Sequence, residues 1–402
     1  MRIVYVSNEY PPQTGLGGIA TYTYYAAHAM AARGHEVHVI CRSEQGNHWV
    51  QNGPVTLHYT GPGEYPLPQN RFFYILRMLC YRFLSHSLQR LAWARSAHQT
   101  LMSIIKQSGR VDIVEYPECG AEGFYIAAKY TGTTTVRLHT PWTFVRKIDK
   151  IKERLPDTLL LAFLEKKAVR QASACNAPSQ AIVKIIPRHW LTAPPVIIPN
   201  PIQTDDFCQT TGRDWIYTGR VEYRKGVHLL INAYAQLCRK SLPPILRLVG
   251  RPYGIMPSGE FYEHYIETLI SQHSLCERIE WIKGTDQNGI KAFLAQSGVA
   301  IFPSLWENYP YSCLEAMASG LAVIASTTGG FPEIIIPKEN GLLFKSENPQ
   351  TLADALTQCL DITTIARLGR AARSWVTVHC SSAILAPKIE AFYNSVVKQG
   401  RS

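Results

Sequence analysis

Short apolar segments alternate with longer amphipathic ones along most of the chain. Runs rich in Val, Ile, Leu and Tyr predict strands in the first half at 2–7, 35–41, 111–116, 134–139, 172–178 and 195–199. The same pattern predicts strands in the second half at 214–219, 245–250, 278–283, 298–303 and 321–326, with helices at 227–240, 261–274, 287–297 and 312–319. Strands that alternate with helices form βαβ units and parallel sheets, so the pattern predicts an α/β protein.

The pattern runs through two cycles, and each begins with a strand, a glycine-containing loop and a helix. A proline-bounded stretch, 194–203, separates the cycles and predicts a hinge between two doubly wound halves. A last amphipathic segment, 382–399, predicts a helix that can pack on either half. In open parallel sheets the ligand binds at the carboxyl ends of the strands, so polar residues at predicted strand ends are the candidates for a site.

Composition narrows the class of protein. The 402 residues are 46% apolar and 18% charged, as in ordinary globular proteins, which excludes a disordered, collagen-like or coiled-coil chain. The longest apolar runs, 158–164 and 297–303, are too short to span a membrane, and the first residues lack the pattern of a secretion signal. The cysteines are scattered without a C-x-x-C pair, which predicts neither a disulfide framework nor a zinc site. We therefore expect a cytoplasmic enzyme.

The positive charge is concentrated in the first half. Residues 1–205 contain 22 lysines and arginines against 13 acids and so carry +9 of the net charge of +11. Segment 71–110 contains seven basic residues and no acid, interleaved with aromatic and aliphatic side chains. Such a helix can dock on an anionic lipid surface, or it can pack its apolar stripe on the core and leave its arginines in solvent. Nucleic-acid binding is disfavoured because no zinc-finger, helix-turn-helix or RNP-type pattern accompanies the charge.

The loop 15–20 matches the G-x-G-x-x-(G/A) fingerprint of dinucleotide-binding proteins. A helix that begins near Ile19 would present its N–H groups and the positive end of its dipole to a phosphate. An NADP-linked oxidoreductase is therefore an alternative function. Against it, residues 8–14 separate the strand from the loop, whereas the dinucleotide fold needs a tight turn there. We retain phosphate binding, although the glycines can also serve close packing of a helix on a strand.

Two carboxylates and two cations stand at predicted strand ends in the second half. Glu307 lies in a loop after a buried strand, and Glu315 lies in the first turn of the next helix, with seven residues between them. Such carboxylates can hold sugar hydroxyls and a ribose diol, although Ser312 and Glu315 also fit a helix capping box. Arg220 and Lys225 precede a helix N-terminus and suit a diphosphate, or else they are solvated loop charges.

His139 ends the predicted strand 134–139 in the first half. A lone histidine is most often structural. One at the carboxyl end of a strand is, however, placed to contact a substrate, so we retain it as a candidate.

A series of motifs in a fixed order resembles the retaining nucleotide-sugar glycosyltransferases of the GT-B type, in family 4. The resemblance rests on segments 8–22, 138–141, 199–207, 218–226, 249–252, 307–320, 329–335 and 340–344. Its most specific part is the E-x7-E element with its L-E-A-M-A-S-G, within 307–320. The resemblance implies two Rossmann-like domains that face each other across a cleft, an acceptor-side domain at 1–203 and a donor-binding domain at 204–381. It also implies that the C-terminal helix, within 382–402, crosses back onto the first domain.

The resemblance implies roles for the four charged candidates. Arg220 and Lys225 are expected to neutralise the diphosphate of the donor. Glu315 is expected to bind the ribose, and Glu307 to face the transferred sugar near the reacting carbon. The implied reaction keeps the anomeric configuration through an oxocarbenium-like state, in which the charge on the leaving group is the main quantity to stabilise. No cofactor and no obligatory metal are implied, since the nucleotide sugar is a co-substrate and no D-x-D element stands at the expected position.

Further donor contacts follow from the same resemblance. The backbone of Gly17 and Gly18 is expected to close over the phosphates, and His139 to contact the donor sugar and so to join Glu307, Arg220 and Lys225 as a predicted catalytic residue. The remaining implied contacts are Val249, Gly250, Ile282 and Gly284 near the base, and Asn308, Tyr309, Pro310, Tyr311 and Ser312 after the first glutamate.

The donor sugar and the acceptor are specified less closely. Many relatives carry an aromatic residue and a glycine after the first glutamate, whereas Asn308–Tyr311 occupy that loop here, and Pro310 lacks an N–H that could meet a sugar hydroxyl. UDP-glucose is the first expected donor, ahead of UDP-N-acetylglucosamine and GDP-mannose. The expected acceptor is a lipid-linked sugar or a polysaccharide, and an anionic membrane surface is a further expected partner if segment 71–110 binds lipid. The expected location is the cytoplasm, with peripheral docking on the cytoplasmic membrane in that case.

Overall fold

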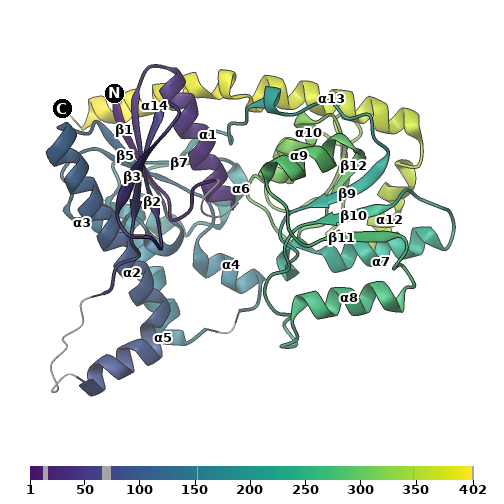
Figure 1. Cartoon of the computed structure of the whole chain (residues 1–402), viewed down its shortest axis with the longest axis horizontal. Coiled ribbons are helices and arrows are strands. Elements are labelled where there is room, and N and C mark those ends of the chain that lie inside the picture. The colour runs from purple at the N-terminus through teal and green to yellow at the C-terminus, as the bar shows by residue number, and fades with distance from the viewer. Residues whose placement is uncertain (12–16, 66–73, 152, 347, 401–402) are drawn as a thin grey trace. The chain divides into compact units, whose positions relative to one another are not determined.

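The computed structural model describes residues 1–402 except 12–16, 66–73, 152, 347 and 401–402 (Figure 1). The chain divides into two compact units. Unit 1 consists of Met1–Lys147, Ile151–Pro201 and Ser382–Ser402, and unit 2 consists of Ile148–Lys150 and Ile202–Ser381. The division after Pro201 lies two residues before the predicted boundary, and the short segment 148–150, which was expected in the first domain, groups with unit 2.

Unit 1 is built on an eight-stranded sheet in the order β3-β4-β2-β1-β5-β6-β7-β8. The strands are β1 (Arg2–Val6), β2 (Glu36–Arg42), β3 (His48–Asn52), β4 (Val55–Thr60), β5 (Ile113–Pro117), β6 (Thr134–Arg137), β7 (Ala174–Ala177) and β8 (Val196–Ile197). All pairs are parallel except β3 with β4. The six predicted strands are present, whereas the β3–β4 hairpin at the sheet edge is not predicted by the hydrophobic pattern.

Helices cover both faces of the unit 1 sheet. The helices are α1 (Gly18–Ala32), α2 (Tyr74–Ser108), α3 (Phe124–Lys129), α4 (Trp142–Ile148), α5 (Leu155–Gln171), α6 (Gln180–Ile185) and α14 (Ser382–Gln399). Right-handed crossovers put α1 on one face and α2, α3 and α5 on the other. The C-terminal helix α14 packs on α1, and its Tyr393 hydroxyl donates to the Tyr5 hydroxyl of β1 at 3.1 Å. The expected return of the chain to the first domain is therefore confirmed.

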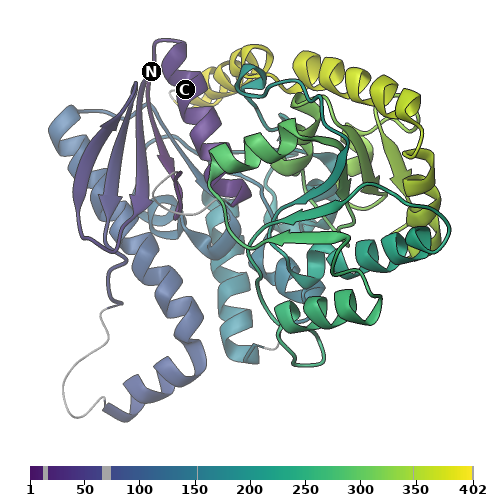
Figure 2. The same cartoon turned by 45° about the vertical axis from the view of Figure 1, so that its right-hand side comes forward.

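Helix α2, which spans most of the basic segment, consists of two parts. Leu84 has non-helical angles (φ −131°, ψ 21°) and interrupts the helix. Asp157 of α5 accepts hydrogen bonds from the N–H groups of His86 and Ser87 at 2.9 and 2.8 Å, and so caps the second part. The second part buries an apolar stripe that includes Leu88, whereas the first part is largely exposed and extends beyond the sheet (Figure 2). Packing of an apolar stripe on the core, one of the two roles predicted for this helix, is therefore found in its second part only.

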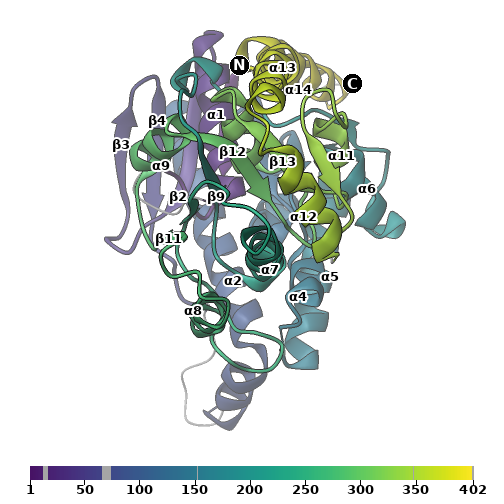
Figure 3. The same cartoon turned by 90° about the vertical axis from the view of Figure 1, so that its right-hand side faces the viewer.

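Unit 2 contains a six-stranded parallel sheet in the order β11-β10-β9-β12-β13-β14. The strands are β9 (Asp214–Thr218), β10 (Leu246–Val249), β11 (Ile279–Ile282), β12 (Ser297–Phe302), β13 (Ala322–Ser326) and β14 (Leu342–Phe344). The helices are α7 (Val227–Cys238), α8 (Tyr262–Gln272), α9 (Gln287–Ala295), α10 (Tyr311–Ala318), α11 (Phe331–Ile334), α12 (Pro349–Gln358) and α13 (Ile362–Cys380). Figure 3 shows this sheet with helices on both faces. Both units are therefore doubly wound α/β domains, as predicted.

Candidate active site

Two loops meet at the carboxyl edge of the unit 2 sheet. They follow the neighbouring strands β9 and β12. The N–H of Leu305 donates to the carbonyl of Arg224 at 2.8 Å. Gly226 has a φ of +68°, and a Cβ at this position would lie 2.0 Å from the carbonyl oxygen of Pro303, so only glycine fits. This close approach brings the cations after β9 to the glutamate after β12.

Glu307 and Lys225 form an ion pair in this contact. The Lys225 ammonium, at the end of a short 3-10 helix (Tyr223–Lys225), donates to Glu307 Oε1, and the Ser304 hydroxyl donates to the same oxygen at 3.2 Å. Glu307 is 8% exposed. Burial opposes its ionisation, but the charges of Lys225 and Arg224 outweigh burial and hold the pKa of Glu307 below its ordinary value. The structure therefore joins two predicted site residues and keeps the carboxylate ionised at neutral pH.

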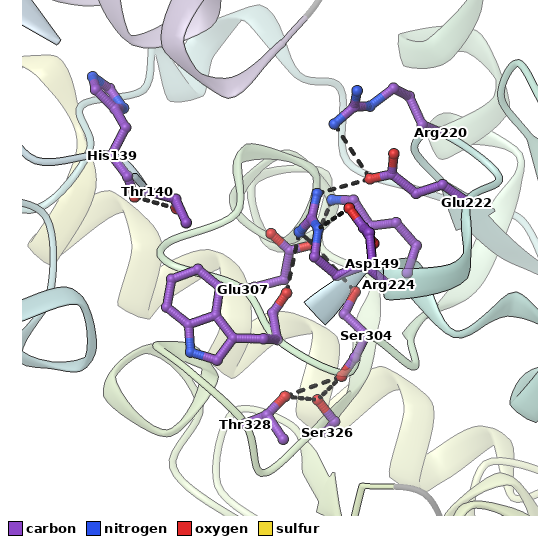
Figure 4. Close-up of polar contacts among 12 residues, drawn as sticks. His139, Thr140, Asp149, Arg220, Glu222, Arg224, Ser304, Glu307, Ser326 and Thr328 are labelled. Atoms are coloured by element: carbon purple, nitrogen blue, oxygen red, sulfur yellow. Dashed lines mark hydrogen bonds and ion pairs between the residues drawn. The ribbon is translucent and has the colours of Figure 1, made fainter. Parts of the chain in front are cut away.

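The backbone of Glu307 is also held by the loop after β13, which contacts the Glu307 carbonyl. The Gly330 N–H donates to the Glu307 carbonyl at 2.9 Å. At Gly329, with a φ of +58°, a Cβ would lie 1.7 Å from the same carbonyl oxygen. The hydroxyls of Ser326 and Thr328 donate to the Ser304 carbonyl at 2.6 and 3.0 Å (Figure 4). The loop that carries Glu307 is thus fixed at both of its ends.

Arg220 lies at the start of the β9 loop with its charge accessible. Its side chain is 52% exposed, and its Nη2 lies 3.2 Å from Glu222 Oε1. The guanidinium also lies over the ring of Tyr253, 5.0 Å from the centroid. Because the group is positioned by these two contacts and still faces solvent, it can meet an anion near the N-terminus of α7.

Glu315 is not part of a capping box. Helix α10 begins at Tyr311 with Pro310 as its N-cap, so Glu315 lies in the second turn and Ser312 does not cap the helix. The Glu315 carboxylate is 6% exposed and accepts a hydrogen bond from the Gln287 amide of α9 at 3.1 Å. Burial raises its pKa, while Gln287 and the charge of Lys291 act in the opposite direction. The capping alternative is therefore wrong, and the carboxylate is held by Gln287 of α9 rather than by the backbone of α10.

The residues predicted near the base also lie at strand ends. Val249 ends β10, Ile282 ends β11, and Gly284 follows two residues later. The Gly250 N–H donates to the Ile282 carbonyl at 2.9 Å, and a Cβ at Gly250 would lie 1.8 Å from the Gly219 carbonyl oxygen. The absence of a side chain at Gly250 thus lets the loops after β9 and β10 pack closely.

The segment after Glu307 divides into buried and accessible residues. Tyr309, Pro310 and Tyr311 are buried, and the Tyr309 hydroxyl lies 3.4 Å from the sulfur of Cys380. Asn308 and Ser312 are partly exposed. Of the predicted donor contacts in this segment, these two therefore present side chains that a ligand can reach.

The three remaining predicted residues lie in unit 1. Gly17 is the N-cap of α1, and Gly18 is its first residue; the first two residues of the glycine loop, 15–16, lie outside the described residues. A Cβ at Gly18 would meet no atom within 4 Å, so packing does not require glycine there. The His139 N–H donates to Glu118 Oε2 at 2.7 Å, and the ring lies edge-on to Tyr22 at 5.3 Å. Burial and the charge of Arg137 hold the pKa of His139 well below its ordinary value, so its imidazole is neutral.

A further cation of the site, Arg224, is not among the residues predicted from the sequence. This residue is 8% exposed, and its Nη2 donates to Glu222 Oε1 at 2.7 Å. Its Nη1 lies 3.6 Å from Glu307 Oε1, and its Nε lies 3.7 Å from Asp149 Oδ2 (Figure 4). Burial raises the pKa of Asp149 to about 6, although Arg224 opposes the shift. The only signal in the sequence is that Arg224 precedes Lys225, because Asp149 is distant along the chain.

The residues that the structure describes contain neither a cluster of metal ligands nor a membrane-spanning helix. No group of three or more histidine, cysteine, aspartate or glutamate side chains in this part of the chain is arranged to hold a metal ion. Among the described helices, none combines the length and the hydropathy of a membrane-spanning segment.

Two family models match successive parts of the chain. The model for Glycosyltransferase Family 4 matches residues 16–206, and the model for Glycosyl transferases group 1 matches residues 208–375. Among curated proteins, glycogen synthase of Mycobacterium tuberculosis is 24% identical over 94% of this chain and 90% of its own length. D-inositol 3-phosphate glycosyltransferase of Jonesia denitrificans is 26% identical over 90% of this chain and 87% of its own.

Solved structures share the fold of the whole chain. Sucrose-phosphate synthase from Thermosynechococcus elongatus superimposes with a TM-score of 0.77 at 21% identity and covers 99% of both chains. Anabaena HepE in complex with UDP-glucose gives a TM-score of 0.66 at 17% identity over 98% of this chain and 100% of its own. The NADP-linked alternative, which depended on the loop 15–20, finds no support in these matches. The matched models, the relatives and the two-domain GT-B fold agree, and the chain belongs to the family 4 (group 1) glycosyltransferases.

Proposed function

We propose that the protein transfers a hexose from a UDP-sugar, with UDP-glucose as the first candidate donor, to a lipid-linked sugar or a polysaccharide, and that it retains the anomeric configuration. The observation that carries the proposal lies at the carboxyl edge of the unit 2 sheet, where Lys225 pairs with the ionised Glu307 and Arg220, on the same loop, keeps an accessible charge beside Glu222. The complex of HepE with UDP-glucose supports a UDP-sugar as the first donor to test.

The proposed chemistry depends on charge. The bond between C1 of the sugar and the diphosphate oxygen breaks, and a bond forms between C1 and the acceptor oxygen on the same face. The acceptor proton passes to the departing diphosphate, so charge and atoms balance. Arg220, Lys225 and the N-terminus of α7 stabilise the leaving diphosphate. Glu307 accepts hydrogen bonds from sugar hydroxyls and stabilises positive charge that develops on the ring. The proposal requires no cofactor or metal, and His139, Gly17 and Gly18 stay predicted contacts of the donor.

A nucleotide panel tests this function. We expect UDP to raise the unfolding temperature more than GDP, ADP or NADP at equal concentration, because a ligand at 100 times its Kd adds about 2.7 kcal/mol of stability. Differential scanning fluorimetry followed by calorimetry of the best ligand measures the effect. A shift with NADP alone, or no shift with any nucleoside diphosphate, would contradict the proposal.

Glu315→Gln is expected to weaken UDP binding. The ribose diol would lose a charged acceptor, and a hydrogen bond to a charged group contributes about 1.5–3 kcal/mol. Calorimetry should show the loss with UDP and a much smaller loss with 2′-deoxy-UDP, which lacks one of the two hydroxyls. The exposed Glu277→Gln in the same unit serves as the control. Equal UDP affinity of Glu315→Gln and wild type would exclude the ribose role.

A surface on unit 1 supports the lipid-linked acceptor. The α2–α5 surface comprises exposed apolar side chains of the first part of α2 and of α5, namely Tyr74, Ile75, Met78, Leu79, Tyr81, Phe83, Leu155, Leu159 and Phe163. Arg154 joins the two helices, since its guanidinium lies over the Phe83 ring at 5.0 Å. With Arg77 and Arg82 it provides positive charge beside exposed apolar groups, a combination that suits anionic lipid.

Binding of this surface to lipid should depend on salt. We expect the protein to sediment with anionic vesicles at low salt and to be released at 1 M salt, where the Debye length falls to about 3 Å. Replacing Arg77, Arg82 and Arg154 by Gln should abolish sedimentation without changing the affinity for UDP. As a control, replacing three exposed basic residues of unit 2 by Gln should change neither sedimentation nor UDP affinity; these are Arg213, Arg239 and Lys240. Arg90 is excluded from the test because it contacts His86. If the protein does not sediment with the vesicles even at low salt, a soluble acceptor is favoured.

A further inference from the structure

The two side chains assigned to opposite parts of the donor are bonded to each other. Lys225 is assigned to the diphosphate and Glu307 to the sugar, yet the ammonium of Lys225 donates to Glu307 Oε1. The side chains are only 16% and 10% exposed, so water screens this pair weakly. A diphosphate that recruits Lys225 must therefore compete with Glu307 for it.

Glu307 has a second cation that a ligand cannot recruit as readily. The side chain of Arg224 is 9% exposed, and its Nη1 lies 3.6 Å from the same carboxylate oxygen. It is anchored by its hydrogen bond to Glu222 at 2.7 Å and by a further hydrogen bond to the Trp306 carbonyl at 3.2 Å. Burial disfavours its charged form, but Glu307, Glu222 and Asp149 together raise the pKa of Arg224 above its ordinary value. Arg224 thus stays charged beside Glu307 whatever Lys225 does.

We propose that Lys225 is exchanged between Glu307 and the donor diphosphate, and that Arg224 is the positioning residue that makes this exchange possible. A buried carboxylate that loses its last counter-ion pays a large desolvation penalty, which would hold Lys225 on Glu307. Arg224 removes that penalty because it remains beside the carboxylate after Lys225 leaves. The inference rests on the proposed function, since it takes a nucleoside diphosphate as the ligand.

The exchange is tested by calorimetry of UDP binding to matched variants. Glu307→Gln should tighten UDP about fivefold or more, because Lys225 loses its internal competitor. In a variant that already carries Lys225→Gln, adding Glu307→Gln should not tighten UDP binding. Arg224→Gln should weaken UDP by a similar factor, and adding Glu307→Gln to it should restore the affinity to at least that of wild type. Arg247→Gln, which removes an arginine paired with Asp214 and Glu280 in the same unit, should leave UDP affinity unchanged.

The outcomes separate this inference from the proposed function. Rescue of Arg224→Gln by Glu307→Gln supports the exchange, since a substitution that merely damaged the loop would not be repaired by a second one. If Arg224→Gln does not fold, the pair of Glu307→Gln measurements with and without Lys225 still decides the question. UDP affinity that is unchanged or weaker in Glu307→Gln, or tightening that persists without Lys225, would overturn the exchange. Failure of the wild type to bind any nucleoside diphosphate would instead overturn the proposed function.

Discussion

Arg220→Ala is expected to weaken UDP binding and to lower turnover together. The guanidinium can meet two diphosphate oxygens at once, and it is already positioned by Glu222 and Tyr253. Truncating one partner of a charge pair that the bound ligand buries costs about 2–5 kcal/mol, which corresponds to a loss of at least about thirtyfold. Calorimetry with UDP and steady-state kinetics with UDP-glucose measure the two effects.

Two further variants make the Arg220 result specific. Arg220→Lys keeps the charge but loses the planar fork, so its affinity for UDP should lie between those of wild type and Arg220→Ala. Arg239→Ala removes an exposed arginine after α7 and should have no effect. If Arg220→Ala folds and binds UDP as wild type does, the residue does not hold the diphosphate.

Glu307→Gln is expected to lower kcat by about 10²–10³-fold while UDP still binds. The substitution keeps the size of the side chain but removes the negative charge beside the reacting sugar. Because the pKa of Glu307 is held below its ordinary value, the wild-type side chain is ionised at the pH of the assay. Single-turnover and steady-state rates with UDP-glucose measure the change, and calorimetry confirms that the nucleotide is still bound.

The Glu307 result requires a folded variant and a neutral control. Its unfolding temperature should rise with UDP at least as much as that of the wild type. Glu339→Gln, at an exposed position in the same unit, should turn over normally. A normal kcat in Glu307→Gln would remove the residue from the reaction and leave it only as the partner of Lys225.

The hydrophobic pattern predicts the strands that are buried in the middle of each sheet. Those segments, such as β9 and β12, are short apolar runs between helices, and their length and their β-branched and aromatic residues identify them as strands. The β3 strand escapes this criterion because four of its five residues are exposed at the sheet edge. The dipeptide Asn52-Gly53, which joins the last residue of β3 to the first residue of the turn, is nevertheless a turn signal that could have revealed it.

Contacts between residues that are distant in sequence account for what the pattern does not predict. The interruption of α2 at Leu84 depends on Asp157, which caps the following turn from another helix. Arg224 becomes a candidate only when Asp149 and Glu307 are placed around it. In contrast, Arg220, Lys225 and Glu307 could be predicted because each follows a strand at the edge where parallel sheets bind ligands.

The proposed transfer of a hexose from UDP-glucose with retention is tested most directly by proton NMR of a reaction that contains the protein, UDP-glucose and an oligosaccharide acceptor. We predict that UDP accumulates only when the protein is present. The first product signal should be that of an α-glycoside, because UDP-glucose is α-configured and retention keeps that configuration. Arg220→Ala and Glu307→Gln should suppress both signals. A β-configured product would contradict retention, and UDP-glucose that stays intact while another sugar nucleotide is consumed would contradict the assigned donor.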